Sequence, residues 1–264
     1  MLDFTRVVTL EAARAALNEN WRPKPRDVVI PASLGVGRVI SEEVISKIDV
    51  PPFDRATYDG YAVRASDTFG AAEDSTVTLD LAGRIMAGTW PRMRLRSGSC
   101  TEITTGAPLP RGANAVVMSE YAVAAEGKVT VYRAVAPGEN VTKRGSDIKK
   151  GQVVIKRLKR LNHLDVAVLA AVGVEKIRVR DKPKVAIISN GSELVKPGEK
   201  LRPGKIYDVN GTSLREAVRA CGAEPVFLGI VPDRAPAIRR AVKKALEIAD
   251  VVLISGGSSV GAGD

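Results

Sequence analysis

The sequence has little cysteine and histidine. The two cysteines, Cys100 and Cys221, stand far apart and match neither a CxxC metal knuckle nor a disulfide framework, so we expect core or surface thiols. The one histidine, His163, has no Cys or Asp at ligand spacing, which favours a structural histidine over a metal ligand. No Ser-His-Asp or Cys-His nucleophile set can be built around it.

The sequence also lacks a long apolar run. No stretch approaches the roughly 18 to 20 apolar residues that a membrane-spanning helix requires, and the amphipathic N-terminus differs from a signal peptide. We therefore expect a cytoplasmic protein with no membrane partner. The hydrophobic share of 45%, with 27% charged residues, is ordinary for globular proteins and favours packed domains over disorder.

The formal net charge of +10 suits an anionic partner such as a nucleic acid, a phosphate or an oxyanion. The lysines and arginines are scattered, however, and only KRGSDIKK and KRLKR form short runs, so an ordinary solvated basic surface is the alternative. Five Tyr and four Phe residues, with no interleaving of aromatic and basic positions, argue against a nucleic-acid partner. Charge alone does not decide the partner.

The chain has the length of two or three domains and reads as an α/β multidomain protein. Apolar positions at helical spacing after Thr9 predict a short opening helix, and short β-branched runs separated by Gly, Pro and Asn predict a β-rich insertion after Pro51 and Pro52. We predict three regions: 1–50 plus 137–180 as a mixed α+β linker or dimerisation domain, 51–136 as an inserted β-rich domain, and 181–264 as an α/β domain.

The last region alternates strand and helix patterns, which predicts a parallel sheet covered by helices. Ser213 with Glu216 forms a candidate capping box for the first helix, and Asp233 is a candidate cap for the second. The sequence stops in a Gly-rich loop directly after a strand, where a further βα unit is expected. We therefore interpret the α/β domain as truncated at its C-terminus.

The terminal loop SGGSSVGAGD follows a buried strand, and ligands in open α/β sheets collect at the carboxyl ends of strands. Its glycines and serines suit an anion, although such a loop is often only a tight turn. Glu193 and Asp264 would meet at the same sheet edge if both strands are parallel, and two carboxylates beside a phosphate loop suit Mg²⁺. The alternative is a helix N-terminal carboxylate at Glu193 and a solvated Asp264.

Acidic residues also occur in the turn-rich segment PPFDRATYDGYAV, which contains Asp54 and Asp59. Acidic residues in turns are usually Asx-type hydrogen bonders, so these positions alone do not indicate a function. The segment TTGAPLP, with Thr105, likewise reads as a loop.

Taken together, seven strings in order resemble the molybdopterin molybdenumtransferase family, which includes MoeA and the E domain of gephyrin: PPFDRATYDGYAV, TTGAPLP, GSDIKKG, SNGSELVKPG, GKIYDVNGTSL, LGIVPD and SGGSSVGAGD. Several strings in register are more specific than any one alone. The resemblance implies that the α/β region is a molybdopterin-binding domain. It further implies an enzyme that takes adenylylated molybdopterin and molybdate, both small anionic substrates, releases AMP and depends on Mg²⁺.

The resemblance carries roles onto particular residues. Glu193 and Asp264 look like the Mg²⁺ carboxylates, and the strand-end and loop positions look like the phosphate and pterin contacts: Ser189, Gly191, Gly256, Gly257, Ser258, Ser259 and Gly261. Four further positions fall on the family's functional acidic and hydroxyl residues: Asp59, Thr105, Asp147 and Asp233. The β-rich domain serves the site across a homodimer in this family, so a homodimer is expected.

Three departures from the family pattern are visible: Asn190 for Thr, Ser258 for Val, and Thr57-Tyr58 for Ser-Met. The family also continues beyond Asp264 with the rest of the sheet, a loop that serves the molybdate site, and a further β domain. A non-catalytic scaffold on the same fold is the main alternative, because fold does not fix function.

Overall fold

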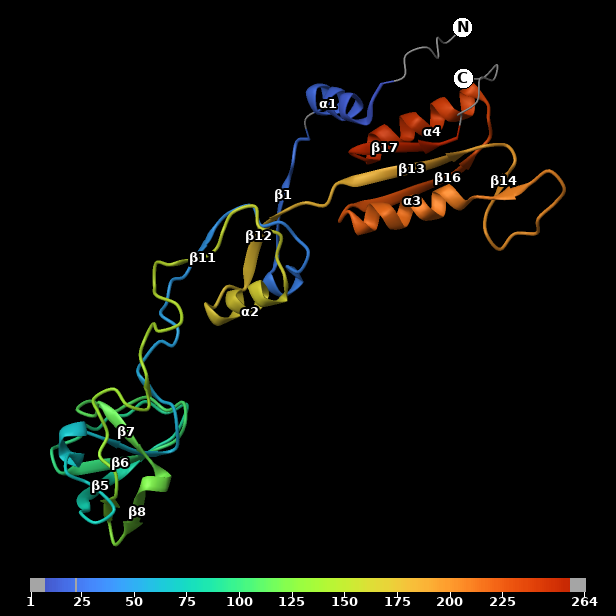
Figure 1. The fold of residues 1–264 in the computed structure, drawn as a ribbon. Coiled ribbons are helices and arrows are strands. Elements are labelled where there is room, and N and C mark those ends of the chain that lie inside the picture. The colour runs from blue at the N-terminus through green and yellow to red at the C-terminus, as the bar shows by residue number, and fades with distance from the viewer. Residues whose placement is uncertain (1–7, 22, 257–264) are drawn as a thin grey trace. The chain divides into compact units, whose positions relative to one another are not determined.

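A computed structural model describes residues 8–21 and 23–256 of the chain. The chain divides into two compact units. The first unit comprises the chain up to Ser41, Arg160–Asn162 and the chain from Lys176 onward. The second unit comprises Glu42–Lys159 and His163–Glu175. Figure 1 shows the elements of each unit.

The first unit opens with helix α1, Leu10–Asn20, as predicted. The Thr9 hydroxyl accepts a hydrogen bond of 3.2 Å from the Ala12 N–H, so Thr9 is the N-cap, and Trp21 is the C-cap. Strand β1, Asp27–Pro31, then pairs antiparallel with β12, Lys176–Arg180. A short 3-10 turn, η1, covers Ala32–Leu34.

The predicted parallel sheet follows in the same unit, with strand order β16-β13-β17. The central strand is therefore β13, and β17 lies beside it. The elements of this α/β part are β13 (Lys184–Asn190), β14 (Leu194–Val195), β15 (Ile206–Tyr207), α3 (Val209–Ala220), β16 (Glu224–Val231), α4 (Ala235–Ile248) and β17 (Val251–Ser255).

The two helices cover opposite faces of this sheet (Figure 1). Val185 and Ile187 of β13 pack with Val218 of α3, whereas Ala186 and Ile188 pack on the other face, where α4 contributes Ala245. This division follows from the period-2 alternation of a strand, which sends successive side chains to opposite faces. Both faces of β13 are consequently buried, as expected for the centre of a parallel sheet.

The second unit contains a six-stranded sheet with the order β7-β4-β6-β5-β9-β8, in which only β5 and β6 are parallel neighbours. Its elements are β4 (Gly60–Val63), η2 (Ala65–Thr68), β5 (Val77–Ile85), β6 (Ser99–Ile103), β7 (Ala115–Met118), η3 (Ser119–Tyr121), β8 (Ala122–Ala125) and β9 (Lys128–Val131). The prediction of a β-rich segment after Pro52 is thus confirmed.

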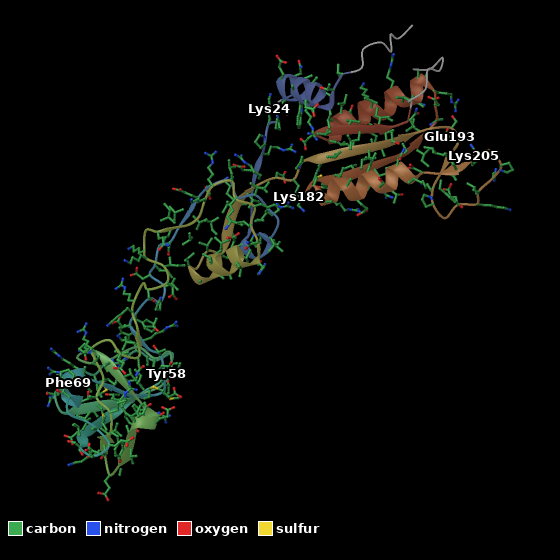
Figure 2. The ribbon with its side chains drawn as sticks, viewed as in Figure 1. Lys24, Tyr58, Phe69, Lys182, Glu193 and Lys205 are labelled. Carbon is green, nitrogen blue, oxygen red and sulfur yellow. The ribbon has the colours of Figure 1, made fainter. Side chains whose placement is uncertain are left out.

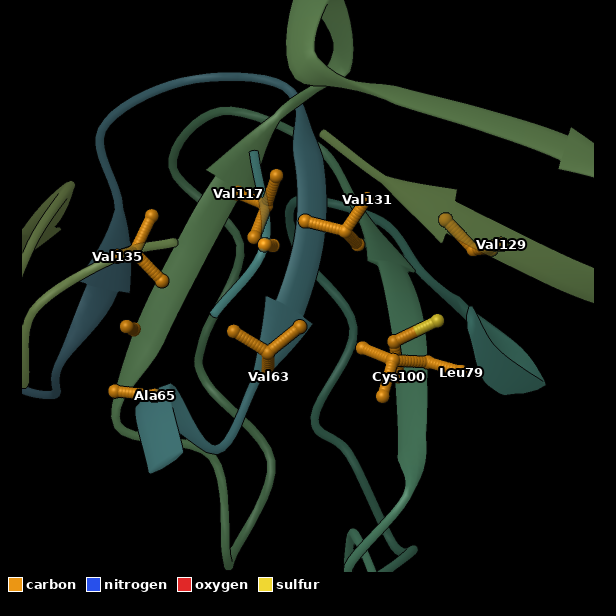
Figure 3. Close-up of a cluster of buried hydrophobic side chains, with 10 residues drawn as sticks. Val63, Ala65, Leu79, Cys100, Val117, Val129, Val131 and Val135 are labelled. Carbon is orange, nitrogen blue, oxygen red and sulfur yellow. The ribbon is translucent and has the colours of Figure 1, made fainter. Parts of the chain in front are cut away.

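Both faces of this sheet carry a core. Val63, Val117 and Cys100 belong to the larger cluster, shown in Figure 3, while Ala62 and Val116 belong to the smaller one. The second unit also holds β2 (Val44–Ile45) paired with β11 (Val153–Ile155), β3 (Arg55–Ala56) paired with β10 (Val141–Thr142), and α2 (His163–Ala171).

Two capping predictions are wrong. Helix α3 begins at Val209 with Asp208 as its N-cap, so Ser213 and Glu216 lie inside the helix and form no capping box. Helix α4 has Arg234 at its N-cap with no capping side-chain hydrogen bond, so Asp233 does not cap it. Gly222 follows the Cys221 C-cap of α3 and has a positive φ of 87°, a conformation that favours glycine at the end of a helix. Within the described residues, no helix combines the length and apolarity that a bilayer crossing requires.

Candidate functional site

The carboxyl ends of β13 and β17 meet at one edge of the parallel sheet. Ser189 of β13 lies opposite Ser255 of β17, which brings Asn190 beside Gly256. Gly256 has a φ of 120°, and a Cβ there would overlap the carbonyl oxygen of Asn190, so only glycine fits this close approach. The segment after β13, which carries Glu193, and the segment after β17, which begins with Gly256, therefore share an edge. Gly257, Ser258, Ser259, Gly261 and Asp264 lie outside the described residues.

Ser189 supports the backbone of this edge. Its side chain is fully buried, and its hydroxyl donates a hydrogen bond of 2.7 Å to Asp208 Oδ2. The other Asp208 oxygen accepts from the Gly211 N–H at 2.8 Å and caps α3. The sequence pattern did not single out Asp208, although an Asp directly before a helix is a recognised cap signal.

Asn190 connects the end of β13 to the chain after β16. Its Nδ2 donates to Asp233 Oδ1 at 3.3 Å, and the Asp233 N–H donates to the Ser192 hydroxyl at 3.2 Å. The Asn190 Oδ1 atom is buried and has no hydrogen-bond partner among the described residues. A buried acceptor of this kind normally has a donor, so this oxygen marks a point where a loop N–H or a ligand donor fits.

Glu193 lies in the turn between β13 and β14, so the alternative role as a helix N-terminal carboxylate is excluded. Its side chain is exposed, and its carboxylate lies over Gly191, where a Cβ would overlap it. Lys205 donates from Nζ to the Ser192 carbonyl at 2.6 Å instead of pairing with an acidic side chain. Figure 2 shows Glu193 and Lys205 at the end of the sheet away from Lys182.

In the second unit, Asp59 and Thr105 are brought together from segments 46 positions apart. Asp59 Oδ1 accepts from the Thr105 N–H at 2.6 Å and from the Thr105 hydroxyl at 2.9 Å. The backbone hydrogen bond, followed by the hydroxyl bond, holds the pKa of Asp59 below its usual value. Asp59 is therefore an oriented, ionised and exposed carboxylate.

Asp147 is exposed, and its carboxylate accepts from the neighbouring Ser146 hydroxyl at 3.0 Å. The segment around it is held by two other acidic residues. Asp54 accepts from Lys143 Nζ at 2.9 Å and from the Arg144 N–H at 2.8 Å. Asp49 accepts from Arg144 Nε at 2.6 Å and from the Lys150 N–H at 2.8 Å. Asp49 and Asp54 thus position the loop that presents Asp147.

The candidate residues fall into two groups, each within one unit. Ser189, Gly191, Glu193, Asp233 and Gly256 lie at or beside the edge of the parallel sheet, and Asp59, Thr105 and Asp147 lie in the second unit. Across residues 8–21 and 23–256, no three His, Cys, Asp or Glu side chains gather closely enough to hold a metal ion. The sheet edge offers glycine backbone, the exposed carboxylates of Glu193 and Asp233, and Lys205, which is a set of groups suited to a phosphate ester with a hard cation.

Two family models match the chain, and each contains one of the two groups of candidate residues. Residues 8–173 match the family described as the MoeA N-terminal region, domains I and II. Residues 186–264 match a family described as a probable molybdopterin-binding domain.

Individual relatives cover nearly the whole chain. A molybdopterin molybdenumtransferase of Staphylococcus epidermidis is 32% identical over 257 residues, and one of Haemophilus influenzae is 34% identical over 259 residues. The chain spans 61% and 63% of the lengths of these relatives. The molybdopterin biosynthesis MoeA protein of Pyrococcus horikosii superposes with a TM-score of 0.85 at 43% identity, covering 96% of this chain and 64% of that one.

Proposed function

The chain belongs to the MoeA family, and from this we propose that it acts in molybdenum cofactor biosynthesis as a molybdopterin molybdenumtransferase. The proposed reaction takes adenylylated molybdopterin and molybdate, releases AMP and leaves molybdenum on the dithiolene of the pterin. The observation that carries the proposal is the meeting of Asn190, Glu193 and Gly256 at the carboxyl edge of the parallel sheet. We also propose that the protein acts in the cytoplasm.

We place the phosphate of the substrate at this edge. Ligands of open α/β sheets bind outside the carboxyl ends of strands, and glycine backbone allows N–H groups to approach an anion. Gly256 supplies such backbone here, whereas the Gly191 N–H already donates to the Val231 carbonyl at 3.1 Å and supports the edge from within. We propose that this anion-binding backbone continues through Gly257, Ser258, Ser259 and Gly261.

The donor set at this edge fits Mg²⁺. Glu193 is an exposed carboxylate that forms no ion pair within the described part of the chain, and Mg²⁺ prefers oxygen ligands of this kind. We propose that Glu193 and Asp264 hold the ion. When bound, Mg²⁺ would neutralise charge on phosphate oxygens, which is what cleavage of a phosphoanhydride link requires.

The remaining residues are proposed to orient the ligand. Asp233 is fixed by Asn190 and Ser192, and Asp59 is fixed by both donors of Thr105, so each carboxylate has a defined direction. Preorganised groups of this kind position a substrate or a water without reorganising during the reaction. We propose that Asp59, Thr105 and Asp147 act on the site of the partner chain in a homodimer.

Calorimetric titration of AMP, with and without Mg²⁺, tests the proposal. We expect Mg²⁺ to tighten AMP binding, and Glu193→Ala to weaken the Mg²⁺-dependent affinity by about tenfold or more because it removes a metal ligand. Glu199→Ala is the matched control, since Glu199 is an exposed glutamate that follows β14. The control variant should bind AMP as the parent does.

Two results would contradict the proposal in different ways. Equal AMP affinity of the parent and Glu193→Ala in Mg²⁺ would remove the metal assignment and leave the nucleotide site. Absence of AMP binding both in this chain and in a chain extended to the full length of its relatives would favour a non-catalytic scaffold.

A further inference from the structure

The second unit contains a hollow of about 810 Å³ with a basic rim. Three arginines, Arg64, Arg94 and Arg96, line it together with the Asn114 amide. Arg94 and Arg96 alternate with Leu95, which is only 3% exposed, so the buried leucine anchors the segment while the arginines on either side stay exposed. The hollow therefore collects guanidinium groups from two separate segments of the chain.

The backbone of this hollow is held firmly. The Leu95 N–H donates to the Arg111 carbonyl at 2.7 Å, and a Cβ at Gly112 would overlap the Leu95 carbonyl oxygen. Gly112 has a φ of 95°, a left-handed conformation that favours glycine. Asn114 Oδ1 accepts from the Ala65 N–H at 2.8 Å, which fixes the chain directly after Arg64 and leaves the Asn114 Nδ2 as a donor.

Asp67, which lies beside two serines of the hollow's lining, forms no ion pair with these arginines. Asp67 accepts hydrogen bonds from the Ser97 hydroxyl at 3.0 Å and from the Gly98 N–H at 2.8 Å, so its carboxylate holds the loop after Arg96. Within the described ranges, Arg64, Arg94 and Arg96 form no ion pair with a carboxylate. Three exposed guanidinium groups around one hollow create a local positive potential that attracts anions.

The hollow lies at the opposite end of two strands from the Asp59–Thr105 pair. Strands β4 and β6 run antiparallel, with Gly60 opposite Ile103. Asp59 and Thr105 flank that end of the strands, whereas Arg64 follows β4 and Arg96 precedes β6 at the other end. The arginine hollow is therefore not part of the Asp59–Thr105 pair.

We propose that this hollow binds a small molecule that carries at least two phosphate groups. Guanidinium groups pair with phosphate oxygens through two parallel N–H bonds, and arginine keeps its charge at every physiological pH. A linked pair of phosphates presents more oxygen acceptors to the three arginines than a single orthophosphate does. The Asn114 Nδ2 adds a neutral donor to the same rim. This site does not depend on the function proposed above.

Calorimetric titration of inorganic pyrophosphate into the full chain tests the site. We expect pyrophosphate to bind more tightly than orthophosphate. The double variant Arg94→Ala/Arg96→Ala should weaken pyrophosphate binding by about tenfold or more, because it removes two of the three arginines that would form charge-assisted hydrogen bonds with the phosphate oxygens. The double variant Arg84→Ala/Lys128→Ala is the matched control, since it removes the same number of positive charges from the same unit at exposed positions on β5 and β9.

The control variant should keep the affinity of the parent, and circular dichroism should show that both double variants are folded. Pyrophosphate affinity within twofold in the parent and in Arg94→Ala/Arg96→Ala would overturn the proposal. Equal weakening in both double variants would overturn it too, because net charge alone would then explain the binding. Mg²⁺-dependent AMP binding should survive in Arg94→Ala/Arg96→Ala, so a failure of this site is distinguishable from a failure of the sheet-edge site.

Discussion

The Ser189 hydroxyl donates to Asp208 Oδ2 across 2.7 Å, and the two residues are 0% and 3% exposed. This bond joins the end of the central strand β13 to the start of helix α3. A Cβ at Gly211 would overlap both partners, so the helix can start this close to the strand only with glycine at that position. The bond therefore fixes the sheet edge on which the proposed substrate site depends.

Replacement of Asp208 by alanine should loosen α3. The variant loses the helix cap and leaves the buried Ser189 hydroxyl without its acceptor, which together cost about 2 to 3 kcal/mol. Hydrogen exchange measured by mass spectrometry should show faster exchange in α3, with the strands of the second unit unchanged. Ser213→Ala is the control, because Ser213 lies inside the helix and should change the exchange little. Equal exchange in the parent and Asp208→Ala would exclude the capping role.

Local patterns predicted the elements whose stability is local. Thr9, as a candidate N-cap, predicted the start of α1. The alternation of strand and helix patterns predicted the parallel sheet. The start of α3 was predicted too late because Asn210, Gly211 and Thr212 have low helix propensity. Gly211 is required there by its packing against Ser189 and Asp208, which is a tertiary contact that no local pattern reveals.

For the candidate site, the sequence predicted which segments lie near each other where strand ends decide it. The segments after β13 and β17 were expected at one sheet edge because the strands are parallel, and Asn190 does lie beside Gly256. Asp54, by contrast, reads from sequence as a local turn residue, yet its partners Lys143 and Arg144 lie 89 and 90 positions away. Such long-range pairing depends on the fold of the β-rich unit, so the sequence pattern could not assign it.

The Thr105 hydroxyl should have a measurable effect on the ionisation of Asp59. The pKa of Asp59 is lowered first by the Thr105 N–H and then by the hydroxyl. Thr105→Val removes only the hydroxyl, so the Asp59 pKa should rise but stay below its usual value. NMR titration of the side-chain carboxyl carbon measures this. Thr78→Val, an exposed threonine on β5, should leave the Asp59 titration unchanged. An identical Asp59 pKa in the parent and Thr105→Val would contradict the pairing.

The two thiols should differ sharply in reactivity. Cys100 is fully buried in the larger core cluster, and burial raises its pKa to about 12, whereas Cys221 is exposed at the end of α3. Because the thiolate is the reactive form, a disulfide reagent at mild alkaline pH should modify Cys221 rapidly and spare Cys100 until the protein unfolds. Peptide mapping identifies the modified residue. Comparable labelling of Cys100 in the folded chain would show that its cluster opens readily.

Asp54 should make the stability of the second unit depend on pH. Burial alone raises the pKa of Asp54, but the hydrogen bonds from the Arg144 N–H and Lys143 outweigh it and the pKa is lowered overall. A lowered pKa in the folded state means that the stabilisation is complete above the usual pKa of Asp and is lost as the pH falls through the lowered value.

Asp54→Asn should therefore reduce the free energy of unfolding at pH 7 by about 1 kcal/mol, since the contacts are partly exposed. The difference from the parent should vanish in acid, where the parent's carboxyl is protonated as well. Urea unfolding of both proteins at neutral and acidic pH measures this. Asp74→Asn provides the control, because Asp74 is an exposed residue of the same unit and should show no such difference at either pH. If the free energy of unfolding of Asp54→Asn stays below that of the parent by the same amount in acid, the amide disturbs packing. In that case the charge of Asp54 does not stabilise the loop that carries Asp147.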